Sequence, residues 1–225
     1  VVGRCATGLQ HGLITLCQLL EAAGAGAALP ALTPADRPAF PVRGVQIDLA
    51  REFYPPLRYL RRVIDRLVDL KVNTLWLYLE NHFRAPGLED LSPRRGLTPA
   101  QARAISAYGA ARGVDVVPGT NLLSHMEGWF RLERYSDFCD GGGRSYPALT
   151  RPEALELVRR YATELACAFP SPNFHAGLDE LLFTGTNPEV RTAIARTGKA
   201  RYYADFAAAV VRHLQSLGKT VWIWD

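Results

Sequence analysis

The stretch Asn-Thr-Leu-Trp-Leu-Tyr-Leu at residues 73–79 decides the fold, because it is an apolar run of the length of a β-strand between two amphipathic segments. The segment before it, residues 57–70, has its apolar side chains at helical spacing. The segment after it, residues 98–112, opens with Thr98 and Pro99, which are a typical N-cap and first residue of a helix. The pattern therefore predicts helix, strand and helix in succession.

The same alternation continues along most of the chain. We expect strands at residues 45–49, 73–79, 114–117, 173–177 and 220–224, and helices at residues 57–70, 98–112, 151–168 and 199–217. Strands that alternate with helices in this way favour repeated βαβ units and a parallel sheet. The sequence has no GxGxxG motif after the first strand, which argues against a dinucleotide-binding sheet. The predicted class is α/β, and we favour a TIM-type (β/α)8 barrel with about five of its eight units present, although other α/β sheets stay open.

Composition excludes several classes of protein. The chain has 225 residues and a net charge of +4, and no apolar stretch approaches the roughly 18 residues that cross a bilayer. The basic cluster at residues 58–66 has a helical repeat with Leu and Ile on its other side, which indicates a solvated helix face. We therefore expect neither a nucleic-acid partner nor a membrane-spanning segment.

Neither metal nor redox chemistry is indicated by the cysteines. Cys5, Cys17, Cys139 and Cys167 show no CxxC spacing and no paired histidines, so we expect no metal site and no cofactor. Cys17 and Cys167 occur in apolar helical patterns and are predicted to be buried free thiols.

Polar residues that carry chemistry follow several of the predicted strands. Asp179 and Glu180 end the fourth strand, His125 follows the third and Glu80 follows the second, while Arg43 stands just before the first. Because the active site of a (β/α)8 barrel lies at one end of the strands, we expect these side chains to meet at one rim. A general acid for a leaving alkoxide is one task that an adjacent pair of carboxylates can perform.

Several of these segments resemble glycoside hydrolase family 20, the β-N-acetylhexosaminidases. The segment His175-Ala176-Gly177-Leu178-Asp179-Glu180 is similar to the family's H-x-G-x-D-E motif, and residues 42–51 (VRGVQIDLAR) are similar to its first strand. Residues 73–81 resemble its second strand, His125 its third-strand histidine, and Trp222-Ile223-Trp224-Asp225 its fifth-strand ending.

The resemblance implies a retaining exo-glycosidase without a protein nucleophile, in which the 2-acetamido oxygen of the substrate attacks the anomeric carbon to give an oxazolinium intermediate. The implied substrate is a glycan with a terminal β-linked N-acetylhexosamine. By the resemblance, Glu180 is the general acid and Asp179 orients the acetamido group. Substrate contacts are expected from Arg43, Trp222, Trp224 and Asp225, with support from His125, Glu80 and His175 behind them.

The resemblance also predicts the domain organisation. Residues 1–30, with a helix from residue 8 to 23, are expected to be the end of a small α+β domain and a linker, and residues 40–225 the first part of the catalytic barrel. Val1 and Asp225 both look like internal positions, so we expect the sequence to be a piece of a longer protein.

The sequence departs from the family's more common pattern at Leu178, at Glu52 and in residues 75–81. These departures resemble a divergent branch that includes the hexosaminidase D type. Two alternatives stay open: another barrel glycosidase whose protein nucleophile lies on a strand outside this sequence, and a carbohydrate-binding barrel without catalysis.

Overall fold

A five-stranded parallel sheet forms the centre of the structure. The computed structural model describes residues 1–26, 28–29, 31–141, 144–181 and 185–224. The strands are β1 (Gly44–Asp48), β2 (Thr74–Tyr78), β3 (Asp115–Gly119), β4 (Asn173–His175) and β5 (Thr220–Trp222). Their order in the sheet is the order in the sequence, β1-β2-β3-β4-β5. The predicted strands are therefore confirmed, although β4 and β5 each end about two residues earlier than expected.

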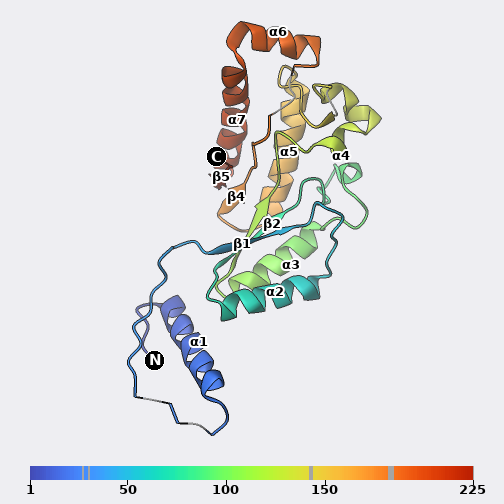
Figure 1. Ribbon diagram of the computed structural model, residues 1–225. Helices are drawn as coiled ribbons and strands as arrows, with labels where there is room; N and C mark the ends of the chain where they lie inside the picture. The colour runs from blue at the N-terminus through green and yellow to red at the C-terminus, as the bar shows by residue number, and fades with distance from the viewer. Residues whose placement is uncertain (27, 30, 142–143, 182–184, 225) are drawn as a thin grey trace.

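A long helix lies in each connection from one strand to the next. These helices are α2 (Leu57–Asp69), α3 (Pro99–Ala110), α5 (Pro152–Ala168) and α7 (Lys199–Ser216). Successive members of this set contact one another, and α2 and α3 lie side by side on one side of the sheet (Figure 1). Consecutive βα units of a barrel have this arrangement, with a sheet inside and helices outside.

Smaller elements fill the connections. The helix α1 (Ala6–Ala23) confirms the predicted N-terminal helix and lies apart from the sheet at the blue end of the chain (Figure 1). The connection from β3 to α5 contains α4 (Glu127–Phe130) and the 3-10 helix η2 (Glu133–Phe138), and the connection from β2 to α3 contains η1 (Glu89–Leu91). A further helix, α6 (Pro188–Thr197), precedes α7. These four were not predicted, because each is short or lacks a long amphipathic repeat.

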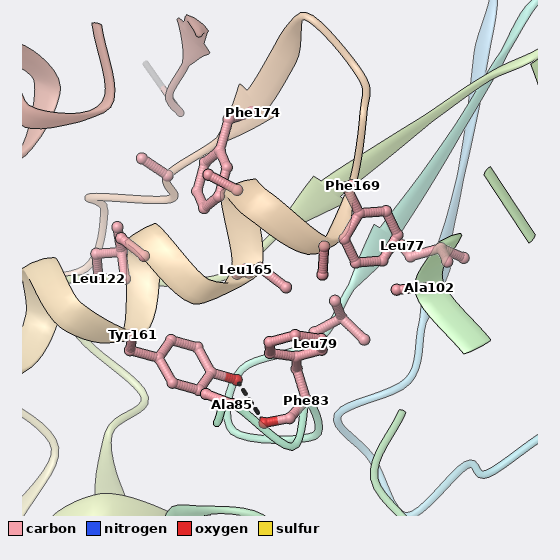
Figure 2. Close-up of a cluster of buried hydrophobic side chains, with 14 of the residues drawn as sticks. Leu77, Leu79, Phe83, Ala85, Ala102, Leu122, Tyr161, Leu165, Phe169 and Phe174 are labelled. Atoms are coloured by element: carbon pink, nitrogen blue, oxygen red, sulfur yellow. Dashed lines mark hydrogen bonds between the residues drawn. The ribbon is translucent and has the colours of Figure 1, made fainter. Parts of the chain in front are cut away.

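The hydrophobic core lies between the sheet and the helices. Leu75, Leu77 and Leu79, which alternate along β2 and just beyond it, are fully buried against this layer. Figure 2 shows Leu77 and Leu79 beside Phe83, Phe169 and other core side chains, with the Tyr161 hydroxyl donating to the backbone oxygen of Phe83. The other face of β2 carries Trp76 and Tyr78, which belong to the barrel interior.

The cap of α3 matches the sequence-based expectation. The Thr98 hydroxyl accepts from the Gln101 backbone N–H while the Gln101 side chain accepts from the Thr98 N–H, and Pro99 is the first helical residue. The cysteine prediction is half right: all four cysteines are free, but Cys17 and Cys167 are exposed, not buried. Each lies on the solvent-exposed face of its helix.

The segments that follow β3 and β4 approach closely at Gly177. The backbone N–H of Leu122 donates to the oxygen of Ala176, and a Cβ atom added to Gly177 would lie 2.7 Å from Cα of Asn121. Gly177 also has a φ of +68°, which glycine adopts without strain. Glycine is required here for space as well as for backbone conformation.

Gly177→Ala should therefore destabilise the fold more than Gly218→Ala. Gly218 has a similar φ of +79° but open space around its Cα, so alanine there should cost about 1–2 kcal/mol from backbone strain alone. At Gly177 the overlap with Asn121 should add roughly 1–3 kcal/mol. Urea unfolding of the two variants measures the difference, and equal losses would contradict the close approach.

Candidate active site

Four successive strands supply side chains to one rim of the sheet. Arg51 follows β1, Glu80 follows β2, His125 follows β3, and Asp179 with Glu180 follow β4. Because the strands are parallel, the segments after them come to the same end of the sheet. The expected meeting of Glu80, His125, Asp179 and Glu180 at this end agrees with the structure.

A chain of charged contacts runs across the rim. Oε2 of Glu180 lies 2.7 Å from Nε2 of His125, and Nδ1 of the same imidazole lies 3.9 Å from Oε1 of Glu80. The second separation is an electrostatic contact, since it is too long for a hydrogen bond. The Glu80 oxygen also accepts from Nη1 of Arg51 at 2.5 Å and from the Tyr78 hydroxyl at 3.1 Å. Glu180 is thus linked through one imidazole to a second carboxylate.

The two carboxylates of this chain differ in solvent exposure. The Glu180 side chain is 54% exposed, whereas that of Glu80 is 12% exposed. Burial raises the pKa of Glu80, and the opposing effects of Arg51, His125 and the Tyr78 hydroxyl do not fully offset it. Glu80 is therefore largely shielded from solvent, whereas Glu180 is accessible to a ligand.

Asp179 has a different partner from its neighbour. Its Oδ1 accepts from the side-chain amide of Asn121 at 2.6 Å. Asn121 follows β3 and was not singled out from the sequence, because an isolated Asn after a strand carries no distinctive signal. Asp179 and Glu180 are thus held by two separate sets of contacts.

The backbone of the rim adopts conformations that are uncommon for residues with side chains. Glu80, His125, Leu178 and Glu180 have φ values of +43°, +57°, +67° and +57°. Left-handed backbone costs about 1–3 kcal/mol per residue and is concentrated at functional sites. The hydrogen bonds between the parallel strands and the side-chain contacts of Glu80, His125 and Glu180 hold these residues in place.

Three aromatic rings line the barrel interior beneath this rim. The ring of His175 stacks on Trp76 with centroids 3.8 Å apart, and Trp224 lies 5.0 Å from Trp76 and 4.9 Å from His175. The Trp76 indole occupies space left by Gly119, where an added Cβ would lie 1.7 Å from Nε1. Trp76 was not proposed from the sequence, although its alternation with the core leucines of β2 could have placed it inside the barrel.

His175 is a neutral imidazole in this layer. Burial lowers its pKa to about 4, and its Nδ1 accepts from the Gly177 backbone N–H at 3.2 Å. The acceptor role of Nδ1 puts the remaining proton on Nε2. His175 therefore supports the segment that carries Asp179 and Glu180.

The other predicted residues of the fifth strand have different outcomes. Trp222 pairs with His175 across the sheet and is half-buried, while Trp224 is 40% exposed beyond the strand. Asp225 lies outside the described residues. The proposed contacts of these three side chains with substrate stay predictions.

The expectation that Arg43 joins the rim is wrong. Arg43 precedes β1, so it lies at the opposite end of the parallel sheet, and its guanidinium donates to the backbone oxygens of Lys71 and Phe40 at 2.8 and 2.7 Å. The arginine at the rim is Arg51, whose side chain is 55% exposed and contacts Glu80. Its position just after the first predicted strand was the available signal.

Other possible sites lie away from the rim or are absent from the described residues. A cavity of about 310 Å³ lies on the outer surface of α5 and α7, where Arg159, Thr163 and His213 line it.

Within the described ranges, no group of three or more His, Cys, Asp or Glu side chains could hold a metal ion. Over the same ranges, no helix is both long and apolar enough to cross a membrane.

Comparison with known proteins gives a consistent family assignment. The model of glycosyl hydrolase family 20, catalytic domain, matches residues 40–225. A chitooligosaccharidolytic β-N-acetylglucosaminidase of Bombyx mori is 30% identical over 197 residues, which are 77% of this chain and 33% of that protein. A β-N-acetylhexosaminidase of Cellulomonas fimi is 28% identical over 99% of this chain and 47% of its own length.

The solved structures agree with the fold. The family 20 β-N-acetylhexosaminidase from Streptomyces coelicolor A3(2) matches with a TM-score of 0.78 and 25% identity over 98% of this chain and 48% of that one. The chain thus spans between a third and a half of the length of these relatives. The match confirms the predicted α/β class and the five-stranded part of a (β/α)8 barrel.

The pKa of His175 predicts how stability depends on pH. The unfolded chain binds a proton at His175 near pH 6.5, while the folded protein resists protonation down to about pH 4. The free energy of unfolding should therefore decrease as the pH is lowered from about 6.5 to about 4, by up to about 3 kcal/mol from this group. In His175→Gln, which keeps an acceptor for the Gly177 N–H but cannot take up the proton, urea unfolding should show a shallower pH dependence. An unchanged slope would exclude this role of His175.

Proposed function

The chain belongs to glycosyl hydrolase family 20, and from this membership we propose that its protein is an exo-acting β-N-acetylhexosaminidase. The proposed substrate is a glycan or glycoconjugate with a terminal β-linked N-acetylglucosamine or N-acetylgalactosamine. The observation that carries the proposal is the linked set Glu180, His125 and Glu80 beside Asp179 at the rim of the sheet.

The proposed reaction needs no nucleophile from the protein. The carbonyl oxygen of the substrate's 2-acetamido group bonds to the anomeric carbon as the glycosidic C–O bond breaks, and the leaving oxygen takes a proton from Glu180. Water then attacks the anomeric carbon of the oxazolinium ion and gives a proton to the Glu180 carboxylate. Because each displacement inverts the centre, the product retains the β configuration.

Glu180 and its partners suit this cycle. The Glu180 side chain is exposed enough to meet a glycosidic oxygen, and Nε2 of the His125 imidazole lies 2.7 Å from its Oε2. Glu80, paired with Arg51, supplies a buried negative charge on the far side of the imidazole. Asp179 is proposed to accept the acetamido N–H, which turns the carbonyl oxygen toward the anomeric carbon.

We propose that Arg51, and not Arg43, contacts the hydroxyl groups of the sugar. Support comes from its position after β1 and from its exposed guanidinium. Trp224, next to Trp76 and His175, is proposed to face the sugar ring or the acetamido methyl group. Trp222 and Asp225 are proposed as further substrate contacts.

Two finer proposals concern the whole protein. We propose that residues 1–30 end a small α+β domain and lead into the barrel, which fits the exposed Leu9, Leu13 and Leu20 on α1. We also propose a place in the divergent branch that resembles the hexosaminidase D type, on the basis of Leu178, Glu52 and residues 75–81. Paired N-acetylglucosaminide and N-acetylgalactosaminide substrates would define the sugar preference.

Glu180→Gln tests the general acid. The amide cannot supply the proton, so turnover of an aryl N-acetylglucosaminide by the intact protein should fall by at least about a hundredfold. Release of the aryl alcohol measures this rate. Glu21→Gln, on the exposed face of α1, makes the same chemical change away from the rim and should leave turnover unchanged.

The mechanism has a substrate control. The corresponding aryl glucoside lacks the acetamido oxygen, so the wild-type protein should not hydrolyse it at a comparable rate. Rapid hydrolysis of both substrates would favour a glycosidase with a protein nucleophile. Near-normal activity of Glu180→Gln would exclude Glu180 as the acid.

Arg51→Ala and Arg43→Ala form a matched pair. Loss of a charged hydrogen bond to substrate is worth about 1.5–3 kcal/mol, so Arg51→Ala should lower kcat/KM by roughly ten- to a hundredfold. Arg43→Ala removes contacts with the backbone at the other end of β1 and should lower thermal stability, with kcat/KM of the folded protein nearly unchanged. Equal catalytic losses would contradict the assignment.

A further inference from the structure

Asn121 is a buried side chain that joins the segments after β3 and β4. It is 2% exposed, and its Oδ1 accepts three backbone N–H groups, from Leu123 at 3.1 Å, Ser124 at 3.0 Å and Leu178 at 3.3 Å. Two of these donors lie in its own loop and the third lies next to Asp179. The amide oxygen therefore holds the backbone of both loops.

These three donors fix which way the amide group points. The oxygen must face the N–H groups, so the NH₂ group must face Oδ1 of Asp179, 2.6 Å away. An amide nitrogen can only donate, so the Asp179 oxygen has to accept. The other oxygen of Asp179 has no hydrogen-bond partner within the described part of the chain.

We propose that Asn121 is a positioning residue, which holds Oδ1 of Asp179 as a hydrogen-bond acceptor and leaves Oδ2 for the acetamido N–H of the substrate. The inference rests on the proposed function for the identity of the substrate group. The hydrogen-bond arrangement that it uses is independent of that function.

The Asn121 side of this contact does not change with pH. Its amide proton does not titrate, whereas a carboxylic acid at the same position would lose its donor on ionisation. The titratable groups around Asp179 are Tyr78 on β2, Glu180 next in the chain and Tyr203 on α7, whose hydroxyl donates to the Leu178 oxygen. Burial, with added repulsion from Glu80 and Asp179, raises the pKa of Tyr78, so this phenol stays neutral.

Asn121→Asp separates the two tasks of the side chain. One carboxylate oxygen can still accept the three backbone N–H groups, so the loops stay joined. The other oxygen replaces the NH₂ group and faces Asp179, which creates a pair of carboxylates that share one proton at low pH. Once both are ionised, the donor is lost and the two charges repel.

The expected result is a change in the pH profile of kcat/KM on an aryl N-acetylglucosaminide. At low pH the variant should keep activity close to wild type, within about threefold, and its basic limb should move down by at least about one pH unit. An unmoved limb would overturn the proposal. A uniform loss at every pH would also overturn it, since that is the result for a structural residue alone.

A second measurement needs no catalytic activity. The loss of thermal stability caused by Asn121→Asp should be larger at about pH 8.5 than at about pH 5, because both carboxylates are charged at the higher pH. In an Asp179→Asn background this pH dependence should disappear. If it persists there, or never arises, the contact with Asp179 does not have the proposed role.

The two measurements distinguish failure of the inference from failure of the proposed function. A wild-type protein that does not release N-acetylhexosamine, together with the expected stability result, would reject the function and keep the contact. If Asn121→Asp does not fold, Asn121→Ser provides the test. Serine retains a short acceptor for the loop but cannot reach Asp179, so it should lower kcat/KM by roughly ten- to a hundredfold in the wild-type background and cause no further loss in an Asp179→Asn background. A loss of the same size in both backgrounds is the result for a structural residue alone and would overturn the proposal.

Discussion

Parallel pairing of the strands is the constraint on which the rest of the structure depends. Since every strand runs in one direction, each helix returns the chain to the same end, and each segment that follows a strand emerges at the other end. Four segments far apart in the sequence thus deliver Arg51, Glu80, His125 and Glu180 to one rim. The helices supply the apolar layer that packs against the sheet.

The precision of the rim depends on close backbone packing just beyond the strands. Gly177 allows the segment after β4 to lie against Asn121, and the amide of Asn121 then reaches both Leu178 and Asp179. Left-handed backbone occurs in the same segments, at His125, Leu178 and Glu180. The strain in these residues is tolerated because the surrounding contacts over-determine the backbone.

The sequence was sufficient to predict the alternating strands and helices, because both depend on local periodicity. It also predicted that Glu80, His125, Asp179 and Glu180 would meet, since each follows a strand. The prediction for Arg43 was wrong because this residue precedes its strand. A parallel sheet places residues before a strand at the opposite end from those after it. Asn121 and Trp76 were missed because their roles depend on contacts across strands, with Asp179 and with His175.

The stacked pair of Trp76 and His175 also gives the protein an internal optical probe. A protonated imidazole in contact with an indole quenches its fluorescence, whereas a neutral one does so much less. The indole of Trp76 is in face contact with that imidazole at the base of the rim, and its Nε1 has no hydrogen-bond partner among the described residues. The emission of Trp76 is thus expected to depend on the protonation of His175, without an added label.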